Sequence, residues 1–423
     1  MRYKIGVIGL GYVGLPLALE FAKHFQVVGY DINEERVELM KICRDPANEV
    51  DSKNFENKRI KFTSNPQMLE HCNFYVIAVP TDIKNDRTPN LKPLINASKD
   101  IGFFLEKEDI VVYESTVYPG CTEEVCVPIL EKGSGLKLNI DFKVGYSPER
   151  IVPGDKERSL PYILKIISGS DTEALEVIEL VYSKIIEAGL FKASSIKVAE
   201  AAKVIENTQR DINISLMNEL SIIFDMMDID TTEVIEAAGT KWNFHKYYPG
   251  LVGGHCISID PFYLMHKAKE LGHEPQVIAA GRKVNDFIPH FISKRLVKAL
   301  IEIGKNPGDC KVLLQGITFK ENVSDIRNSK VVDLIRELMS FSINVHITDP
   351  HASANEVVLE YNLTLKTKID NNYDAIIIAV PHTYYKKLSE FEYFKLFKDK
   401  PIIFDLKKIR YDLKEKCSFY WCL

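Results

Sequence analysis

The stretch that decides the fold is YKIGVIGLGYVGLPLALEFAKHFQVVGYDIN, residues 3–33. An apolar, β-rich run leads directly into Gly9, Gly11 and Gly14, which have GxGxxG spacing. A helix-length apolar stretch follows, and a second run, VVGYD, ends in Asp31. The acid lies about 20 residues after the glycines, as in dinucleotide-binding βαβ units. The pattern therefore predicts strand, turn, helix and strand, and a dinucleotide site at the turn.

Each part of this pattern has a chemical reason. Gly9 makes the tight turn, Gly11 lets the backbone approach a pyrophosphate, and Gly14 permits close packing of the helix. The helix N-terminus faces the phosphates, and Asp31 can bind both ribose hydroxyls. An acid at this strand end favours NAD over NADP, because a 2′-phosphate would meet like charge. The alternative is a glycine-rich turn in another α/β fold.

Composition limits the class of protein. The chain has 423 residues, 46% hydrophobic and 27% charged, with a net charge of −5. These values are typical of a soluble globular protein with two or three domains. Without a basic block, a signal-peptide layout or a membrane-length apolar run, we expect no nucleic-acid partner and no membrane. Eight scattered cysteines without CxxC spacing indicate a reducing cytoplasm and no metal site.

Polar residues follow two further predicted strands of the first domain. Thr81 ends NFYVIAVPT, and Ser115 and Thr116 follow DIVVYE. Strand ends of this kind face the ligand crevice in a doubly wound sheet, so these hydroxyls either bind the cofactor or cap the next helix. Glu149, in FKVGYSPERIVPGD, is a candidate base after another strand or an exposed loop acid.

A long helix is predicted from Ser194 or Ser195 to about residue 228, without proline or glycine. A helix of this length usually joins domains or builds a dimer interface. Glu200, Lys203, Asn207 and Arg210 step by three or four residues, so they share one face. That face is either solvated or functional; Lys203 and Asn207, one turn apart, could stabilise an oxyanion.

After about residue 305 the α/β pattern returns. The segment IIAVPH echoes VIAVPT of the first domain, and VHITD echoes VVGYD, but QGITFK replaces the glycine fingerprint. We therefore expect a ligand other than a dinucleotide here, with Phe319 and Lys320 as candidate contacts. The expected fold is α/β, with two Rossmann-like doubly wound domains joined by a long central helix and a helical domain. The boundaries are 1–193, 194–304 and 305–423.

One cysteine lies in a glycine-rich stretch, GLVGGHCISIDPF, residues 250–262. Cys256 is either a buried structural residue or a nucleophile held on a loop for a substrate carbon. Residues 250–262 by themselves leave both possibilities open.

Six motifs in order resemble the UDP-glucose/GDP-mannose dehydrogenases over nearly the whole chain. They are GLGYVGLP, ESTVYPG, SPERIVPGD, AAKVIENTQRDINI, GLVGGHCISIDPFYL and GITFKENVSDIRNSKVVD. The resemblance implies an N-terminal NAD domain, a C-terminal UDP domain and a homodimer or higher oligomer built on the central helix. The motifs are most similar to the bacterial UDP-N-acetylhexosamine branch, which serves capsule and O-antigen synthesis, as in Vi antigen. UDP-glucose enzymes carry a second acid after SPE, where this chain has Pro153.

The resemblance also implies roles for individual residues in a four-electron oxidation at C6 of the sugar. Cys256 forms a thiohemiacetal and then a thioester, while Lys203 and Asn207 stabilise oxyanions. Asp260, Glu149 and Thr116 share the duties of base and water activation, and His255 supports the loop. The implied cofactor contacts are Gly9, Gly11, Tyr12, Val13, Gly14, Asp31, Arg36, Thr81, Thr116 and Arg327. The implied substrate contacts are Glu149, Arg150, Lys203, Asn207, Arg210, Tyr248, Gly250, Gly253, Phe319 and Lys320. Arg282 is implied to reach the substrate in the partner subunit's site.

The sequence is also compatible with rival interpretations. UDP-GlcNAc is the expected substrate, with UDP-GalNAc, UDP-ManNAc and UDP-glucose as alternatives. A single-step β-hydroxyacid dehydrogenase shares the first domain and a helix lysine, but it needs neither Cys256 nor residues 305–423. A non-catalytic nucleotide-sugar sensor would keep the fold without needing Lys203, Asn207, Cys256 and Asp260 together.

Overall fold

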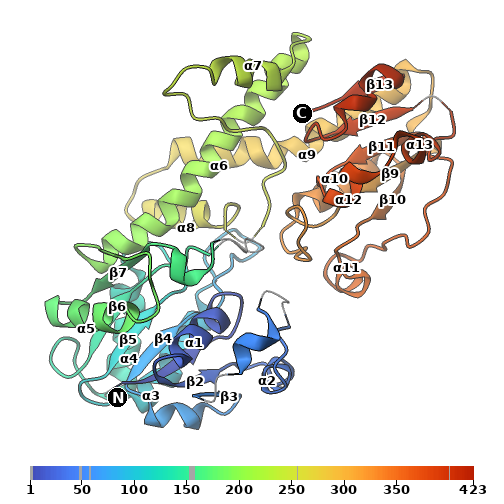
Figure 1. Ribbon diagram of the computed structural model, residues 1–423. Coiled ribbons are helices and arrows are strands. Elements are labelled where there is room, and N and C mark those ends of the chain that lie inside the picture. The colour runs from blue at the N-terminus through green and yellow to red at the C-terminus, as the bar shows by residue number, and fades with distance from the viewer. Residues whose placement is uncertain (1–2, 47–49, 57–58, 152–157, 255, 400) are drawn as a thin grey trace. The chain divides into compact units, whose positions relative to one another are not determined.

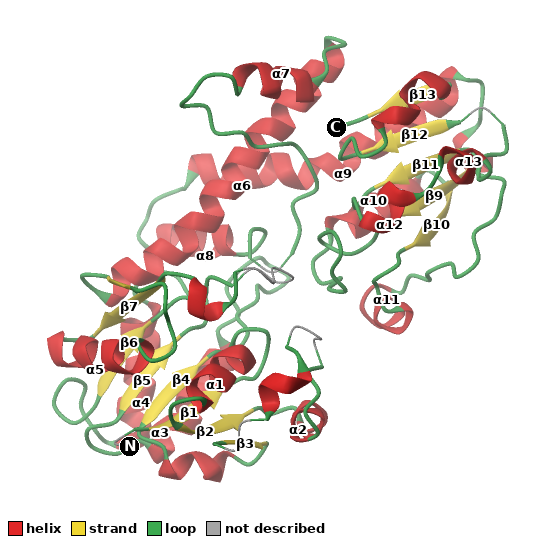
Figure 2. Cartoon of the chain, viewed as in Figure 1, coloured by secondary structure: helices red, strands yellow, loops and turns green. Residues whose placement is uncertain are grey.

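The computed structural model describes residues 3–46, 50–56, 59–151, 158–254, 256–399 and 401–423. The chain divides into two compact units (Figure 1). Unit 1 comprises the residues up to 206 together with 262–274, and unit 2 comprises residues 207–261 and 275–423. Each unit contains one sheet with helices packed against it (Figure 2). The expected α/β fold with two mainly parallel sheets and a long central helix is confirmed.

The sheet of unit 1 has eight strands in the order β3-β2-β1-β4-β5-β6-β7-β8. All neighbours pair in parallel except β6 and β7, which are antiparallel. Strands β4 and β5 are buried along their whole length, as expected for central strands covered on both faces. The strands are β1 (Lys4–Ile8), β2 (Gln26–Tyr30), β3 (Ile60–Thr63), β4 (Phe74–Ile77), β5 (Ile110–Tyr113), β6 (Lys143–Tyr146), β7 (Lys165–Gly169) and β8 (Leu190–Lys192).

Five helices connect these strands. They are α1 (Gly14–Ala22), α2 (Glu34–Lys41), α3 (Lys92–Phe104), α4 (Val127–Ser134) and α5 (Thr172–Tyr182). Side chains of α1 and α5 share one core with β1, β4 and β5. Asn33 and Asp171 start α2 and α5 by accepting hydrogen bonds from the first-turn backbone N–H groups. The C-terminal ends of β1 to β6 therefore lie at one edge of the sheet, where the glycine turn lies.

The central helix α6 spans Ile196–Met226, 31 residues. The Ser195 side chain accepts a hydrogen bond from Val198 N–H at 3.3 Å, so the predicted serine cap is present. Residues of α6 up to 206 belong to unit 1, and those from 207 belong to unit 2. The other helices of the middle region are α7 (Thr231–Ala238), α8 (Asp260–Glu270) and α9 (Gln276–Glu302).

The sheet of unit 2 has five parallel strands in the order β10-β9-β11-β12-β13. The strands are β9 (Lys311–Gln315), β10 (Asn344–Thr348), β11 (Ala375–Ile378), β12 (Ile402–Asp405) and β13 (Phe419–Trp421). The helices are α10 (Lys330–Ser340), α11 (Ala354–Tyr361), α12 (Thr383–Lys387) and α13 (Glu390–Phe394). The second half of α9 packs into the same apolar core as this sheet. The terminal segment CSFYWCL supplies β13.

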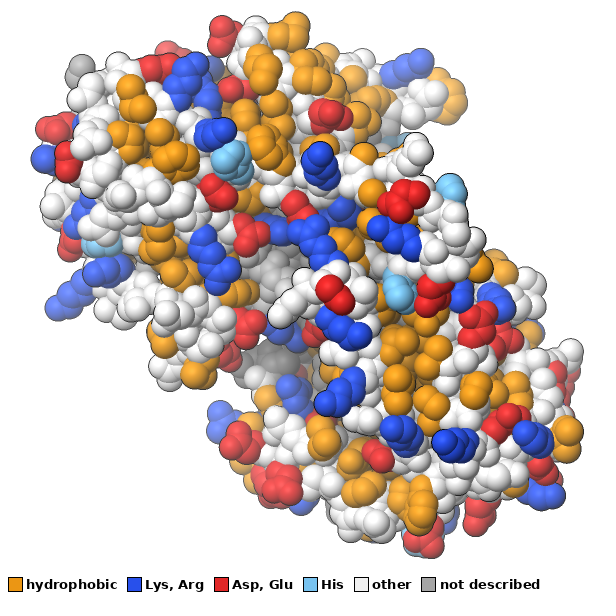
Figure 3. All heavy atoms as spheres, turned by 180° about the vertical axis from the view of Figure 1, so that it is seen from behind, with side chains coloured by type: hydrophobic (Ala, Val, Ile, Leu, Met, Phe, Trp, Pro, Cys, Tyr) orange, Lys and Arg blue, Asp and Glu red, His pale blue; other side chains and the backbone are white. Residues whose placement is uncertain are grey.

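The surface of the described residues carries charges of both signs. On the face shown in Figure 3, lysine and arginine side chains lie among aspartate and glutamate side chains. Over the described part of the chain, every helix is too short or too polar to cross a bilayer.

Candidate active site

The turn after β1 forms a cradle of backbone. Gly9 has φ +87°, and its N–H donates to the Tyr30 carbonyl at 2.9 Å. A Cβ on Gly14 would lie 1.8 Å from the Gly9 carbonyl oxygen, so α1 can begin here only with glycine. A Cβ on Gly11 would meet no atom within 4 Å. The space beside Gly11 is therefore open, as a pyrophosphate site requires.

Asp31 lies beside this cradle at the end of β2. One carboxylate oxygen accepts the Leu10 N–H at 2.8 Å, and the other accepts the Asn33 N–H at 2.9 Å. The guanidinium of Arg36 donates to the Leu10 carbonyl at 3.2 Å. The acid is thus fixed by backbone groups, and lone pairs remain on both oxygens for ribose hydroxyls. Open glycine, helix N-terminus and oriented acid fit NAD.

The other predicted cofactor contacts of unit 1 lie along the same edge of the sheet. Thr81 is buried and follows β4, and Thr116 is half-buried and follows β5. The Ser115 hydroxyl donates to the Val79 carbonyl at 2.7 Å, so Ser115 joins the two strand ends rather than capping a helix. Tyr12, which is half-buried in the glycine turn with its neighbour Val13, completes this edge.

Glu149 is buried, with 6% of its surface exposed, so it is not a solvated loop acid. Its Oε1 accepts the Arg150 N–H at 2.6 Å and also the Ile151 N–H. Its Oε2 is buried and has no hydrogen-bond partner among the described residues. One oxygen is thus fixed and the other keeps its lone pairs. Pro153, on which the comparison with UDP-glucose enzymes depends, lies outside the described residues.

A second group of predicted residues meets in unit 2. The side-chain amide N–H of Asn207 donates to the Asp260 carboxylate, and the Arg210 guanidinium donates to the side-chain oxygen Oδ1 of Asn207. Asn207 and Asp260 are 1% and 2% exposed. The Cys256 carbonyl accepts the Asp260 N–H at 2.9 Å and the Ile259 N–H at 3.1 Å, which ties the cysteine to the start of α8. Cys256 is half-buried, and His255 lies outside the described residues.

The polar stripe of α6 is not a solvated face. Glu200, Lys203 and Asn207 are all buried, whereas Arg210 is exposed. Glu200 accepts the backbone N–H groups of Gly120 at 2.5 Å and Thr122 at 2.9 Å. Burial raises the pKa of Glu200 to about 7, although these hydrogen bonds lower it. Glu200 therefore joins α6 to the loop after β5.

The glycine-rich loop packs closely against protein. A Cβ on Gly253 would lie 2.5 Å from the Asn328 carbonyl, and one on Gly254 would lie 2.7 Å from the Phe319 ring. A Cβ on Gly250 would lie 2.2 Å from the Lys407 ammonium. We expected these glycines to bring the backbone near a sugar, and their own neighbours already require glycine. They bring the cysteine loop and the Phe319 loop together.

The C-terminal sheet repeats the first turn with different side chains. Gly316 has φ +92° and donates to the Thr348 carbonyl at 2.8 Å, as Gly9 does with Tyr30. Asp349 takes the place of Asp31 and accepts the Ile317 N–H at 2.7 Å. Buried Thr318 and His382 bond to one another, at 3.1 Å, in the place of the open glycine. The cradle is therefore filled, which agrees with a ligand other than a dinucleotide.

Four predicted contacts lie elsewhere in unit 2. Tyr248 is 41% exposed and its hydroxyl bonds to Glu236. Arg327 forms two hydrogen bonds with Asp325, at 2.7 and 2.9 Å. Lys320 and Phe319 are half-buried on the loop after β9.

Arg282, which we expected to reach a partner subunit, is 3% exposed in this chain. Its guanidinium donates to Asp211 at 2.6 Å and to Asp286 at 2.7 Å. Arg282 therefore already joins α6 to α9 within one chain.

Sequence reasoning missed a buried ion pair behind Glu149. Lys165, the first residue of β7, contacts Glu114 with Nζ 2.7 Å from Oε2. Both side chains are 3% exposed or less. The pair gave no local signal, because its two residues lie at the ends of different strands and are 51 positions apart.

Family comparisons agree with this geometry. The chain matches three parts of one family: its NAD binding domain over residues 3–186, its central domain over 197–287 and its UDP binding domain over 313–411. The chain belongs to the UDP-glucose/GDP-mannose dehydrogenase family. This confirms the resemblance, the NAD cofactor and an NAD-dependent dehydrogenase.

Similar members of the UDP-glucose/GDP-mannose dehydrogenase family include two proteins named UDP-N-acetyl-D-glucosamine 6-dehydrogenase. The Salmonella typhi protein is 52% identical over 408 residues, 96% of each chain. The Pseudomonas aeruginosa protein is 52% identical over 406 residues, also 96% of each chain. Among solved structures, the UDP-D-ManNAc dehydrogenase from Pyrococcus horikoshii has a TM-score of 0.90 at 29% identity, covering 99% of this chain and 98% of its own.

Proposed function

We propose that the protein oxidises C6 of UDP-N-acetyl-D-glucosamine to the carboxylate, with two NAD⁺ reduced per sugar. The observation that carries the proposal is the 52% identity over 96% of the chain with two enzymes named for this substrate. Relatives named UDP-N-acetyl-D-mannosamine dehydrogenase are 31% identical. The product is a precursor of the kind used for surface polysaccharide.

The oxidation requires two hydride transfers and one hydrolysis. NAD⁺, which the glycine turn and Asp31 would hold, would supply the acceptor for each hydride. Lys203 and Asn207 stabilise the alkoxide that forms when the C6 hydroxyl loses its proton. The Cys256 thiolate then adds to the aldehyde carbon, which prevents escape of the aldehyde. Loss of the second hydride from this thiohemiacetal leaves a thioester.

Hydrolysis of the thioester needs a base for water. The buried Oε2 of Glu149 suits this role, since its lone pairs are not taken by the described residues. Water adds to the thioester carbon and gives one proton to Glu149, and the C–S bond breaks to release the carboxylic acid and the Cys256 thiolate. The carboxylic acid then loses its remaining proton to solvent. Asp260, held by Asn207, orients that amide and accepts protons near Cys256. Thr116, which follows β5 at the sheet edge that carries the glycine turn, shares in the activation of water.

Substrate contacts complete the proposal. Arg150, Arg210 and Lys320 supply cations for phosphate or carboxylate groups. Tyr248, Gly250, Gly253 and Phe319 lie on the two loops that pack together in unit 2. Arg36 and Arg327 are assigned to NAD.

The substrate assignment is tested with purified protein, NAD⁺ and one UDP-sugar at a time. We expect kcat/KM for UDP-GlcNAc to exceed the values for UDP-GalNAc, UDP-ManNAc and UDP-glucose by at least about tenfold, roughly 1.4 kcal/mol in transition-state binding. A higher value for another sugar would replace UDP-GlcNAc. Binding of a UDP-sugar without any NADH formation would favour the non-catalytic sensor.

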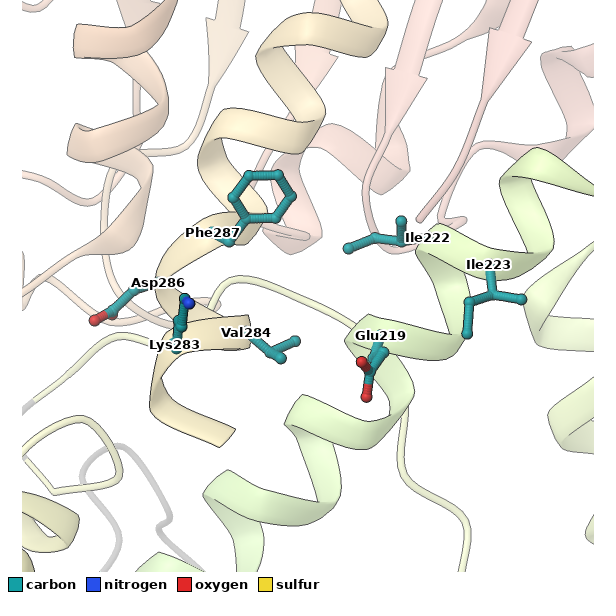
Figure 4. Close-up of a pocket in the computed structure, with 7 residues that line it drawn as sticks. All are labelled: Glu219, Ile222, Ile223, Lys283, Val284, Asp286 and Phe287. Carbon is teal, nitrogen blue, oxygen red and sulfur yellow. The ribbon is translucent and has the colours of Figure 1, made fainter. Parts of the chain in front are cut away.

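We also propose a homodimer built on α6. Leu216, Ile223 and Met226 of this helix are 50%, 44% and 77% exposed, which is unusual for large apolar side chains on one helix. Beside them a groove of about 560 Å³ opens between α6 and α9 (Figure 4). Phe287 and Val284 of α9 line it together with Ile222 and Ile223 of α6. A second copy of this face would cover these side chains.

We place the reaction in the cytoplasm. The structure shows no disulfide bond among the described residues. A chain with eight cysteines and no such bond suits a reducing compartment.

A further inference from the structure

The carboxylate that we assign to water activation has a buried support behind it. Glu114 follows β5, Lys165 opens β7, and Tyr182 ends α5. The Lys165 ammonium donates to Glu114 Oε2 at 2.7 Å, and the Tyr182 hydroxyl donates to Glu114 Oε1 at 2.6 Å. All three side chains are 3% exposed or less. Three separate elements therefore meet at one buried carboxylate.

The same ammonium holds the backbone that carries Glu149. Lys165 Nζ donates to the Pro148 carbonyl at 3.0 Å, one residue before Glu149. The Lys165 ammonium also lies over the Tyr182 ring, with Nζ 5.7 Å from the ring centroid. The Ser147 hydroxyl also donates to the Ile166 carbonyl at 2.8 Å, so the next residue of β7 holds the same segment. The position of Glu149 thus depends on Lys165.

A buried ion pair is weak evidence for a role in stability. Its desolvation cost usually offsets the attraction, and apolar replacements are often neutral or stabilising. Here burial raises the pKa of Glu114 to about 7; the charge of Lys165 lowers it and the charge of Glu149 raises it. The charged and titratable groups that act on Glu114 are Lys165, Glu149 and Tyr182. Lys165 therefore pairs with Glu114, and the charge of the proposed base acts on the same carboxyl group.

We propose that Lys165 and Glu114 are positioning residues for thioester hydrolysis: together they fix the segment that carries Glu149. This inference rests on the role proposed for Glu149. Lys165 holds the segment through Pro148. Glu114 gains negative charge as the pH rises through about 7, which strengthens its pairing with the Lys165 ammonium. Neither residue touches the reacting atoms.

The test compares Lys165→Met and Glu114→Gln with a matched control, Lys143→Met. Lys143 forms an ion pair with Asp171 at the opposite end of β6, so its loss disturbs the same sheet without touching Glu149. Each variant is mixed with NAD⁺ and UDP-GlcNAc, the reaction is quenched, and the mass of the intact protein is measured by mass spectrometry. We expect Lys165→Met to lower kcat at least about tenfold, with KM within about threefold, and to accumulate the acyl adduct on Cys256.

Glu114→Gln keeps the acceptor for Lys165 and tests the charge alone. In the wild type the rate of acyl-adduct decay should rise through about pH 7, and this rise should be absent in Glu114→Gln. The control should behave as wild type. Wild-type adduct decay in Lys165→Met, or an unchanged pH profile in Glu114→Gln, would overturn the inference.

Glu149→Gln separates this inference from the one on which it rests. If Glu149→Gln accumulates the adduct and Lys165→Met does not, the positioning role is wrong and the base stands. If Glu149→Gln hydrolyses the adduct at the wild-type rate, the assignment of the base is wrong, and the positioning role is overturned with it.

Discussion

Two alanine substitutions three residues apart, Gly11→Ala and Gly14→Ala, should have opposite effects on stability. A Cβ on Gly11 would meet no atom within 4 Å, so the protein loses no contact. Replacing glycine where no strain arises changes the free energy of unfolding by less than about 1 kcal/mol, in the stabilising direction. A Cβ on Gly14 would lie 1.8 Å from the Gly9 carbonyl oxygen, whereas real contacts stay beyond 3.0 Å. The backbone must move, at a cost of about 1–3 kcal/mol.

Binding of NAD should separate the two variants further. The methyl group of Gly11→Ala projects into the space assigned to the pyrophosphate, so Kd for NAD should rise at least about tenfold, or 1.4 kcal/mol. Urea unfolding of the free protein and calorimetric titration with NAD measure the two effects separately. Gly14→Ala serves as the destabilised control. A Gly11→Ala protein that binds NAD as tightly as wild type would refute the placement of the cofactor on this turn.

Three further predictions concern the nucleophile, the C-terminal turn and the subunit contact. Cys256→Ser should lower uronate formation at least about a thousandfold, as measured by mass spectrometry of the product, while NAD binding stays unchanged. Burial raises the pKa of Asp349, but hydrogen bonds from His382 and backbone N–H groups outweigh it and lower this pKa to about 2. Asp349→Asn should therefore cost about 2 kcal/mol in urea unfolding at pH 7, and the difference from wild type should vanish as the pH falls from about 4 to about 2. Ile223→Glu should shift the protein to monomer in light scattering, whereas Leu359→Glu, an exposed position on α11, should not.

Local patterns account for the features that the sequence predicted well. Gly9, Gly11, Gly14 and Asp31 act within one strand–turn–helix–strand unit, so their spacing alone specifies the turn. The start of α6 follows from Ser195 and a long run without proline or glycine. The repeated strand motifs likewise predicted the second sheet, because parallel buried strands are continuous apolar runs.

Other features depend on contacts between distant positions. Glu114 and Lys165 are 51 residues apart, and the carboxylate pairs with the lysine only after the sheet has formed. The glycines of the cysteine loop are explained by Asn328 and Phe319, which no spacing within the loop indicates. Strand β13 has only three residues, too few to show the alternation of apolar and polar residues that indicates a strand. Its pairing with β12 defines it.

The central claim is that one chain carries out both oxidations through Cys256. The most direct measurement is the number of NADH molecules formed per UDP-GlcNAc consumed when the reaction has gone to completion. The account predicts two, with UDP-N-acetylglucosaminuronate as the product. A ratio of one, with an aldehyde or no carboxylate product, would contradict the thioester route.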